Sequence, residues 1–546
     1  MPRLWYLPII VFSLARVSPC AAQTTAGNEA CAGCHQKIYD SYSKTSMASA
    51  SGPAVKGVIP GEFRHEKSGV LYRIYRQGDR AWVSFERPGD PSVKGTRELL
   101  YYIGSNRTGR SYLFSTDDFL FESPVNWYAQ KAVWDMTPAY QDAREVPLNL
   151  PAVADCLTCH TSGMTPPIAG TENRYRLPAI KHAGVTCQRC HGNDVAHASG
   201  KGHTINPVQL SPARRDAICM QCHLEGTVAI DRAGRHLYDF KPGDALDEYI
   251  RYFVLKDRQT ERNPTLSQVE ALAQSVCKQK SGDRMSCMSC HDPHTTPDKT
   301  ERVTFYRAKC LACHSGRIAT KHHADQPDCT SCHMPFKMGT VVAHTQTTDH
   351  RILRRPSNDA ELPLADNKAD VPQLVPFPDA QGKQGNEREL ALAWQSLAEG
   401  GMQAAVPEAN RLLRAAVEEY PADAALLSAL AYDEQKRGNI KDAAELYERA
   451  LKFDPERIDA AMNLGVIQAQ DGHLGDAIKM WQEAFEHAPG RSAIGMNLAY
   501  AFCASGQYTQ ARKYVSRVLE FNPDLGRARR LALSLNADPP SCANQR

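Results

Sequence analysis

The chain has 546 residues, of which 42% are hydrophobic and 23% are charged, so it can form several ordinary packed domains. Its 64 Lys and Arg against 61 Asp and Glu leave a formal net charge of +3, which argues against a strongly basic nucleic-acid-binding surface. Its 18 cysteines are too few for so long a chain to be a small disulfide-stabilised scaffold.

The N-terminus has the pattern of a secretory signal. A basic start at Arg3 precedes an apolar run from Leu4 to Leu14, and small residues end the segment at Ala22. This pattern predicts a signal peptide over residues 1–22 and a periplasmic or extracellular mature protein. An uncleaved anchor or a lipidated Cys20 are the alternatives, although the apolar run is short for a membrane span.

Seven copies of Cys-x-x-Cys-His, here numbered motifs one to seven, are the strongest signal. They are Cys31-Cys34-His35, Cys156-Cys159-His160, Cys187-Cys190-His191, Cys219-Cys222-His223, Cys287-Cys290-His291, Cys310-Cys313-His314 and Cys329-Cys332-His333. This is the attachment signature of haem c, in which two thiols bond to the porphyrin and the histidine ligates the iron. Zinc sites do not require a histidine directly after every pair of cysteines, so we expect seven covalently attached haems.

Three cysteines remain outside the signal and the motifs. Cys503 and Cys542 are candidates for a disulfide in an oxidising compartment. Cys277 is expected to be a small buried residue.

Six-coordinate haems also need a second axial ligand. The haem-bearing part holds surplus histidines, and position favours His182, His197, His294, His344 and His350, with one of His322 and His323. Met47, soon after motif one, is either a thioether ligand there or a core residue. The sequence does not assign these ligands to particular irons, and it assigns no catalytic residue.

Residues 23–150 hold motif one and a β-rich segment. Leu71 to Glu86 predicts two strands around the turn at Gly78, and Glu98–Ile103 and Ser111–Phe114 continue the β pattern. Two glycines between the latter strands are more typical of a hairpin loop than of a phosphate loop, because no lysine follows them. The aromatic residues at 127, 128 and 134 fit a β-domain core or haem packing.

Residues 151–355 crowd six motifs between Cys156 and His333. Such a stretch leaves little room for a side-chain core, so we expect the porphyrins to form the core, with short helices and loops around them. Closely stacked haems exchange electrons, which makes electron transfer the main functional expectation.

Residues 356–386 are rich in proline and predict a linker. Residues 387–540 then repeat every 34 residues. The recurring positions are Gly438, Gly472 and Gly506; Ala443, Ala477 and Ala511; and Pro421, Pro455, Pro489 and Pro523. This is the tetratricopeptide pattern, with three clear repeats and a degenerate one before them. Such solenoids usually bind proteins or peptides, although a purely structural role is the alternative.

The haem-bearing part resembles the multihaem cytochromes of the cytochrome c-554 and hydroxylamine-oxidoreductase-like group over about Asn28 to Pro356. The resemblance is carried by Cys31-Ala-Gly-Cys-His35, Cys187-Gln-Arg-Cys-His191-Gly192, Cys287-Met-Ser-Cys-His291-Asp-Pro-His294, Cys329-Thr-Ser-Cys-His333-Met-Pro335 and Thr348-Asp-His350-Arg-Ile352. It implies bis-histidine haems in stacked pairs and electron transfer, sometimes with nitrogen-oxide chemistry. From the patterns above we expect a mainly α, haem-cored domain with a small β-rich insertion, followed by an α-solenoid. Related proteins often have a histidine where this chain has Met47.

These observations predict an exported seven-haem cytochrome that carries electrons between redox partner proteins, with the repeats as a docking domain. We expect no nucleic-acid partner and no transmembrane segment in the mature chain. The alternative is an oxidoreductase acting on a small nitrogen or other oxyanion substrate at a five-coordinate haem, for which motif one is the candidate. A third interpretation makes the repeat domain the functional part and the haems a redox sensor or a scaffold. The chain lacks Cys-x-x-Cys-Lys, the motif of ammonia-forming nitrite reductases.

Overall fold

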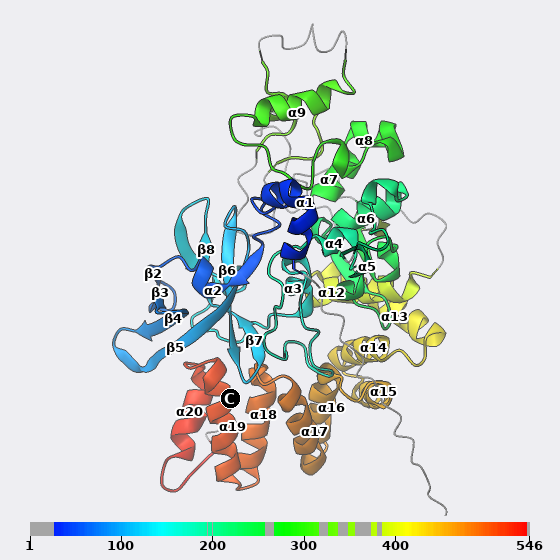
Figure 1. Ribbon diagram of the computed structural model, residues 1–546. Coiled ribbons are helices and arrows are strands. Elements are labelled where there is room, and N and C mark those ends of the chain that lie inside the picture. Colours follow the sequence, from blue (N-terminus) through cyan, green and yellow to red (C-terminus); the bar gives the residue numbers. More distant parts are fainter. Residues whose placement is uncertain are drawn as a thin grey trace, which may run out of the picture.

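The computed structural model describes residues 27–193, 195–198, 200–256, 267–315, 326–336, 348–354, 373–378 and 385–542. The predicted signal peptide, the candidate ligands His322, His323 and His344, and most of the predicted linker lie outside these residues. Figure 1 shows a β-sheet, a helical part that carries the motifs, and a helical solenoid running along both. Within the described ranges, no helix is long and apolar enough to cross a membrane.

A nine-stranded antiparallel sheet follows the first motif. Its strands are β1 (Ser51–Pro53), β2 (Gly61–His65), β3 (Val70–Gln77), β4 (Arg80–Arg87), β5 (Asp90–Ile103), β6 (Gly109–Thr116), β7 (Phe119–Glu122), β8 (Val125–Tyr128) and β9 (Val133–Met136). The main path is β2-β3-β4-β5-β6-β8-β9, while β1 pairs with β5 and β7 pairs with β6. The turn between β3 and β4 lies at Gly78, as the sequence predicts.

The sheet has a hydrophobic core of its own, which the predicted fold class missed. Tyr72, Val83 and Phe114 are fully buried, and Trp134 packs into the same cluster. Alternating apolar side chains place one face of each strand in this core. The core of the sheet is therefore built from side chains and does not depend on a porphyrin. The prediction of a mainly α, haem-cored domain with a small β insertion is therefore wrong for the N-terminal part, which is β-rich.

The motifs sit on short helices. These are α1 (Glu29–Tyr42), α3 (Ala154–His160), α4 (Gln188–His191), α6 (Pro212–His223), the 3₁₀ turn η7 (Cys287–Ser289), α9 (Arg302–Leu311) and α11 (Cys329–His333). Helices α2 (Ala54–Gly57), α5 (Val195–Ala198), α7 (Gln268–Gln274) and α8 (Val276–Ser281) lie between them. Four motif helices end at the motif histidine, and a helical turn puts thiols three residues apart on one face.

Side-chain cores are unevenly distributed among the motifs. Leu157, Tyr175 and Ile180 belong to one buried cluster, and Leu237 and Tyr252 belong to another, so the chain around motifs two to four does build ordinary cores. The expectation that porphyrins alone replace the core is wrong there. After Ala271, in contrast, no hydrophobic residue is buried before Leu374 in the parts of the chain that the structure describes. Motifs five to seven lie in that interval.

Part of the predicted linker forms a strand. β12 (Leu374–Phe377) pairs with β11 (Ile250–Leu255), which also pairs with β10 (Val228–Asp231). The resulting three-stranded sheet packs against the first repeat helices through Phe253 and Trp394.

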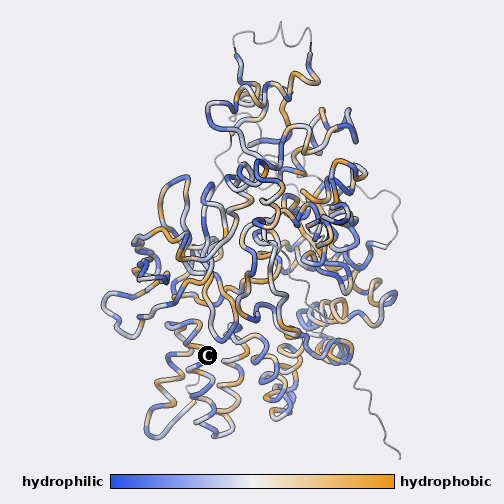
Figure 2. Tube along the Cα trace, viewed as in Figure 1, coloured by the Kyte–Doolittle hydropathy of each residue, from blue (hydrophilic) through white to orange (hydrophobic). Residues whose placement is uncertain are grey.

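The C-terminal part is the expected solenoid of antiparallel helix pairs. Its helices are α12 (Glu387–Glu399), α13 (Val406–Glu419), α14 (Ala424–Arg437), α15 (Ile440–Phe453), α16 (Ile458–Gln470), α17 (Leu474–His487), α18 (Ser492–Ala504), α19 (Tyr508–Phe521) and α20 (Gly526–Leu535). Hydrophobic and hydrophilic residues alternate along these helices (Figure 2). Gly438 and Gly472 both have a φ of +87° at the turns inside repeats, which explains the recurring glycine. The predicted Cys503–Cys542 disulfide is present.

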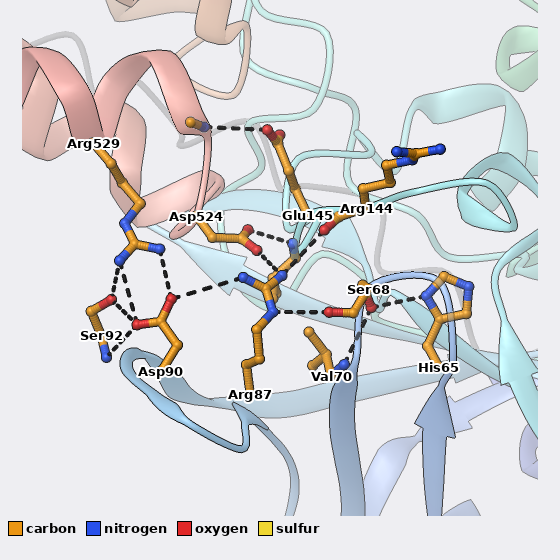
Figure 3. Close-up of polar contacts among 12 residues, drawn as sticks. His65, Ser68, Val70, Arg87, Asp90, Ser92, Arg144, Glu145, Asp524 and Arg529 are labelled. Atoms are coloured by element: carbon orange, nitrogen blue, oxygen red, sulfur yellow. Dashed lines mark hydrogen bonds and ion pairs between the residues drawn. The ribbon is translucent and has the colours of Figure 1, made fainter.

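The solenoid is attached to the rest of the chain at both ends. At its start, Arg232 next to β10 forms an ion pair with Glu389 of α12 at 2.6 Å. At its end, Asp524 pairs with Arg87 and accepts a hydrogen bond from the main-chain N–H of Val146 at 2.6 Å (Figure 3). The repeats therefore form a fixed edge along the molecule.

Candidate haem-attachment and electron-transfer site

Three of the expected distal histidines lie opposite motif histidines, and the two rings of each pair are nearly parallel. The pairs are His35 with His197, His191 with His294, and His291 with His350, whose ring centroids lie 6.2, 5.9 and 6.3 Å apart. Their interplanar angles are 17°, 13° and 27°. The structure thereby matches each of these three histidines to one motif, which spacing in the sequence does not do.

This spacing fits one metal ion between two imidazoles. A metal–imidazole bond is about 2 Å long and the ring centre lies about 1 Å beyond the nitrogen, so two axial rings stand about 6 Å apart. The donor chemistry also fits, because two imidazoles above and below a porphyrin are a common haem ligation.

Hydrogen bonds orient several of these rings. The Nδ1 atom of His191 lies 2.9 Å from the carbonyl oxygen of Ile205, and that of His350 lies 2.8 Å from the carbonyl of Thr348. A carbonyl only accepts, so Nδ1 carries the proton in each bond and donates it. The opposite atom, Nε2, is then unprotonated, which is the form that ligates a metal.

Burial also favours the neutral imidazole. It lowers the pKa of His191, His223, His291 and His350, and the like charges of neighbouring histidines add to the effect at the first three. His223 and His291 have exposed surface, although the protein around them still lowers their pKa. Neutral histidines bind metal without first losing a proton.

Further contacts join motifs that are distant in sequence. Asn28, just before motif one, accepts hydrogen bonds from the main-chain N–H of Cys187 at 2.9 Å and from its thiol at 3.1 Å. The Cys159 thiol of motif two lies 3.7 Å from the carbonyl oxygen of Gln221 in motif four. Motif four also meets motif five, because hydrogen bonding to Cys287 raises the pKa of Cys219.

Motifs six and seven form the end of this group. Nη1 of Arg307, on α9, lies 4.0 Å from the sulfur of Cys329. Burial raises the pKa of Cys310 to about 11, and the nearby Cys329 and Cys290 add to this rise. Motif six therefore lies between motifs five and seven. Helix α9 is at the opposite end of the molecule from the last repeats (Figure 1).

The other predicted ligands fall elsewhere. His182 lies beside Gly163 and Gly27, and among the described residues its ring stacks on no motif histidine. The main-chain carbonyl of Met47 accepts from the N–H of Val185 at 2.9 Å, and it is His197 that faces His35. The geometry thus gives motif one a histidine pair and does not support it as the five-coordinate candidate.

Sequence reasoning missed the polar residues that link motifs. Asn28 and Gln221 act through contacts more than 60 positions away in the chain, so no local pattern marks them. The aromatic residues at 127 and 134 belong to the sheet core, with ring centroids 5.9 Å apart, which decides between the two roles considered for them. Cys277 is partly exposed, contrary to the expected burial.

Comparison with known families agrees with these parts. A model described as cytochrome c554 and c-prime matches residues 128–192, which include motifs two and three. A doubled CXXCH motif model matches residues 280–319, which include motifs five and six. Two tetratricopeptide repeat models match residues 428–479 and 468–534. The comparison with curated proteins gave no match.

Several matching solved structures cover about a quarter of this chain. One from a functional characterization of Pseudomonas aeruginosa PilF is 25% identical, covers 28% of this chain and 68% of that chain, and has a TM-score of 0.25. A crystal structure of MamA is 20% identical, covers 25% and 72%, and has a TM-score of 0.22. A tetratricopeptide repeat protein from Parabacteroides merdae is 21% identical, covers 28% and 58%, and has a TM-score of 0.24.

The family matches and the motifs agree on two features of this chain. The matched cytochrome models include four of the Cys-x-x-Cys-His motifs and support covalently bound haem c. Tetratricopeptide repeats, which typically mediate protein–protein interaction, follow in the same chain. Two parts of this chain are therefore similar to haem-binding c-type cytochromes, and its C-terminal part is similar to tetratricopeptide repeat proteins.

Proposed function

We propose that this protein is an exported cytochrome with seven haems that passes electrons between redox partner proteins. Haem c supplies reversible one-electron chemistry when bound. The observation that carries the proposal is the interlocking of the histidine pairs. The ring opposite motif one comes from the segment after motif three, the ring opposite motif three from the segment of motif five, and the ring opposite motif five from the segment after motif seven.

This interlocking sets an order for the motifs. Each pair ties one odd-numbered motif to the next, so motifs one, three, five and seven form a connected series. The contact between Cys159 and Gln221 ties motif two to motif four, and Cys219 ties motif four to motif five. We propose that electrons enter and leave at the two ends of this series, at motif one and at the α9 end.

The repeats support a role in positioning partners. Their inter-repeat turns meet the rest of the chain at Gly490, whose carbonyl oxygen accepts a hydrogen bond from Asn149, and at Asp524, which accepts one from the N–H of Val146. A partner protein bound by the solenoid is then held at a fixed position relative to the motifs. The chain's predicted signal supports export, where covalent haem attachment and the Cys503–Cys542 disulfide are both compatible with the compartment.

Mass spectrometry and spectroscopy of the full-length holoprotein test the proposal. We expect seven haem masses per mature chain and low-spin spectra that nitrite, hydroxylamine and nitric oxide leave unchanged. Fewer haems would contradict the count, and a spectral change on adding these molecules would favour the oxidoreductase alternative.

Single variants test the ligand pairs. His197→Ala, His294→Ala and His350→Ala should each convert one haem to the high-spin state, because each removes one axial ring. His236→Ala is the matched control, since this exposed histidine pairs with Asp231 at 3.2 Å and faces no motif histidine in the described residues. High-spin signal in the control, or none in the three variants, would refute the assignment.

A further inference from the structure

The turns between successive repeats form one edge of the solenoid, and this edge contacts the rest of the chain repeatedly. Glu456, Gly490 and Asp524 hold the same place in three of these turns, with the 34-residue spacing of the repeat. Each of the three touches a residue that precedes the solenoid by more than 280 positions. The repeats therefore present a regular row of contact points to the rest of the protein.

The chain before motif two is held at two of these turns. The main-chain N–H of Val146 donates to the carboxylate of Asp524 at 2.6 Å (Figure 3). The side chain of Asn149 donates to the carbonyl oxygen of Gly490 at 3.2 Å. Between them, the N–H of Leu148 donates to the last carbonyl of α19 at 2.9 Å. Val146 and Leu148 are fully buried, so their N–H groups depend on these acceptors in place of water.

The chain after motif two reaches the same edge. Glu172 forms an ion pair with Arg491, the residue after Gly490. Gly170 lies so close to the next turn that a Cβ atom on it would stand 2.7 Å from the Cδ atom of Glu456. Both flanks of motif two therefore contact the solenoid, although the motif itself lies on α3.

Little chain separates the first of these flanks from motif two. The N–H of Ala152 donates to the carbonyl oxygen of Leu120 in β7 at 2.9 Å. Helix α3 then begins at Ala154 and carries Cys156 in its first turn. Extended chain spans at most about 3.3–3.6 Å per residue, so a few residues fixed at both ends cannot absorb a displacement. A shift of the solenoid against the sheet must therefore move α3.

We propose that the inter-repeat edge of the solenoid is an intramolecular docking surface, and that its ligand is the chain on both sides of motif two. Asp524 and Asn149 are then positioning residues for the haem attached at this motif, because they hold its helix through the flanking chain. A partner protein binds the solenoid elsewhere, since this edge is already occupied. Only the redox consequence of the inference rests on the proposed function.

Hydrogen exchange of the full-length holoprotein tests the contact. Asp524→Ala leaves the buried N–H of Val146 without its acceptor, so this amide should exchange about ten- to a hundredfold faster than in the wild type. The amides of α3 should also exchange faster. Asp524→Asn keeps an oxygen that accepts from Val146, and it should stay closer to the wild type. Asp476→Ala is the matched control, because this exposed aspartate of α17 follows a turn inside a repeat, at the other edge.

Redox titration adds a readout that a general loss of stability would not move in this way. Asp524→Ala with seven haems retained should shift one of the seven reduction steps, because the contacts flank one motif. Asp524→Asn should return this step toward its wild-type potential, and Asp476→Ala should leave all steps unchanged.

The outcomes separate this inference from the proposed function. If Asp524→Ala does not fold, Asn149→Ala replaces it, since this change removes only the contact to Gly490. Wild-type exchange at α3 in a folded variant, unchanged reduction steps, or an equal effect of Asp476→Ala would overturn the inference. Fewer than seven haems in the wild type would instead refute the proposed function, and faster exchange at α3 in Asp524→Ala would still support the docking surface.

Discussion

The attachment of the solenoid to the sheet depends on Phe521, and replacing this residue by alanine gives a sharp test. Phe521 ends helix α19 and is only 1% exposed. Its ring packs on Phe121 of strand β7 with a centroid distance of 5.2 Å, and it belongs to the core cluster of the sheet. Its main-chain carbonyl accepts the N–H of Leu148 at 2.9 Å. One residue of the repeats thus completes the core of another domain.

The expected cost follows from the loss of a buried ring. Truncation of a buried phenylalanine to alanine typically destabilises a protein by about 3–5 kcal/mol. Phe485→Ala is a matched control, because Phe485 is 5% exposed and packs on Tyr514 at 5.8 Å within the repeat core. We expect a similar loss of free energy of unfolding in both variants, but only Phe521→Ala removes a contact with the sheet.

Hydrogen exchange of the native protein distinguishes the two. In Phe521→Ala, the amide of Leu148 and the amides of β7 should exchange faster than in the wild type, because local opening of the joint becomes easier. In Phe485→Ala, faster exchange should be confined to α17, α18 and α19. Equal exchange of the Leu148 amide in both variants would refute the idea that the repeats are built into the sheet.

Three further predictions follow from single features. His350→Ala should leave its partner motif with one axial imidazole, and electron paramagnetic resonance should then show one high-spin ferric haem that added imidazole returns to low spin; no change would contradict the pairing. Hydrogen bonds from Arg529 and then Ser92 hold the pKa of Asp90 well below its ordinary value of 3.8, so this carboxylate stabilises the joint above about pH 4 and loses that contribution as the pH falls further; Asp90→Asn should remove the acid-dependent part of hydrogen exchange at the joint. Replacing Cys503 by serine should lower the free energy of unfolding by up to about 4 kcal/mol, because the disulfide closes a loop with a sequence separation of 39; urea unfolding with and without a reductant measures this, and reductant-sensitive stability in the variant would contradict it.

Local sequence patterns predict much of the organisation of this protein. The seven attachment motifs, the solenoid of the repeat region and the first strands all depend on residues close together in the chain, and short-range geometry dictates them. Two thiols three positions apart share a helix face, and glycine at Gly438 permits the positive φ that its turn needs. Such features can be predicted from the sequence without knowing which other residues contact them in the fold.

The extent of the sheet was harder to predict for a physical reason. Strand β5 begins with polar residues and is held by its neighbours on both sides, β4 and β6. Strands β7 to β9 have four residues each, too few for a clear alternation. Pairing with partners elsewhere in the chain, and not local preference, makes these segments strands.

By itself the sequence located the seven Cys-x-x-Cys-His motifs, the repeats and the surplus of histidines, because each of these depends on residue type and near neighbours. Only the tertiary structure decided that His197 faces His35 and that Phe521 completes the core of the sheet. These contacts join residues up to 400 positions apart, such as Phe121 and Phe521. No periodicity encodes such pairs, since they arise when independently formed elements bury their remaining surfaces against one another.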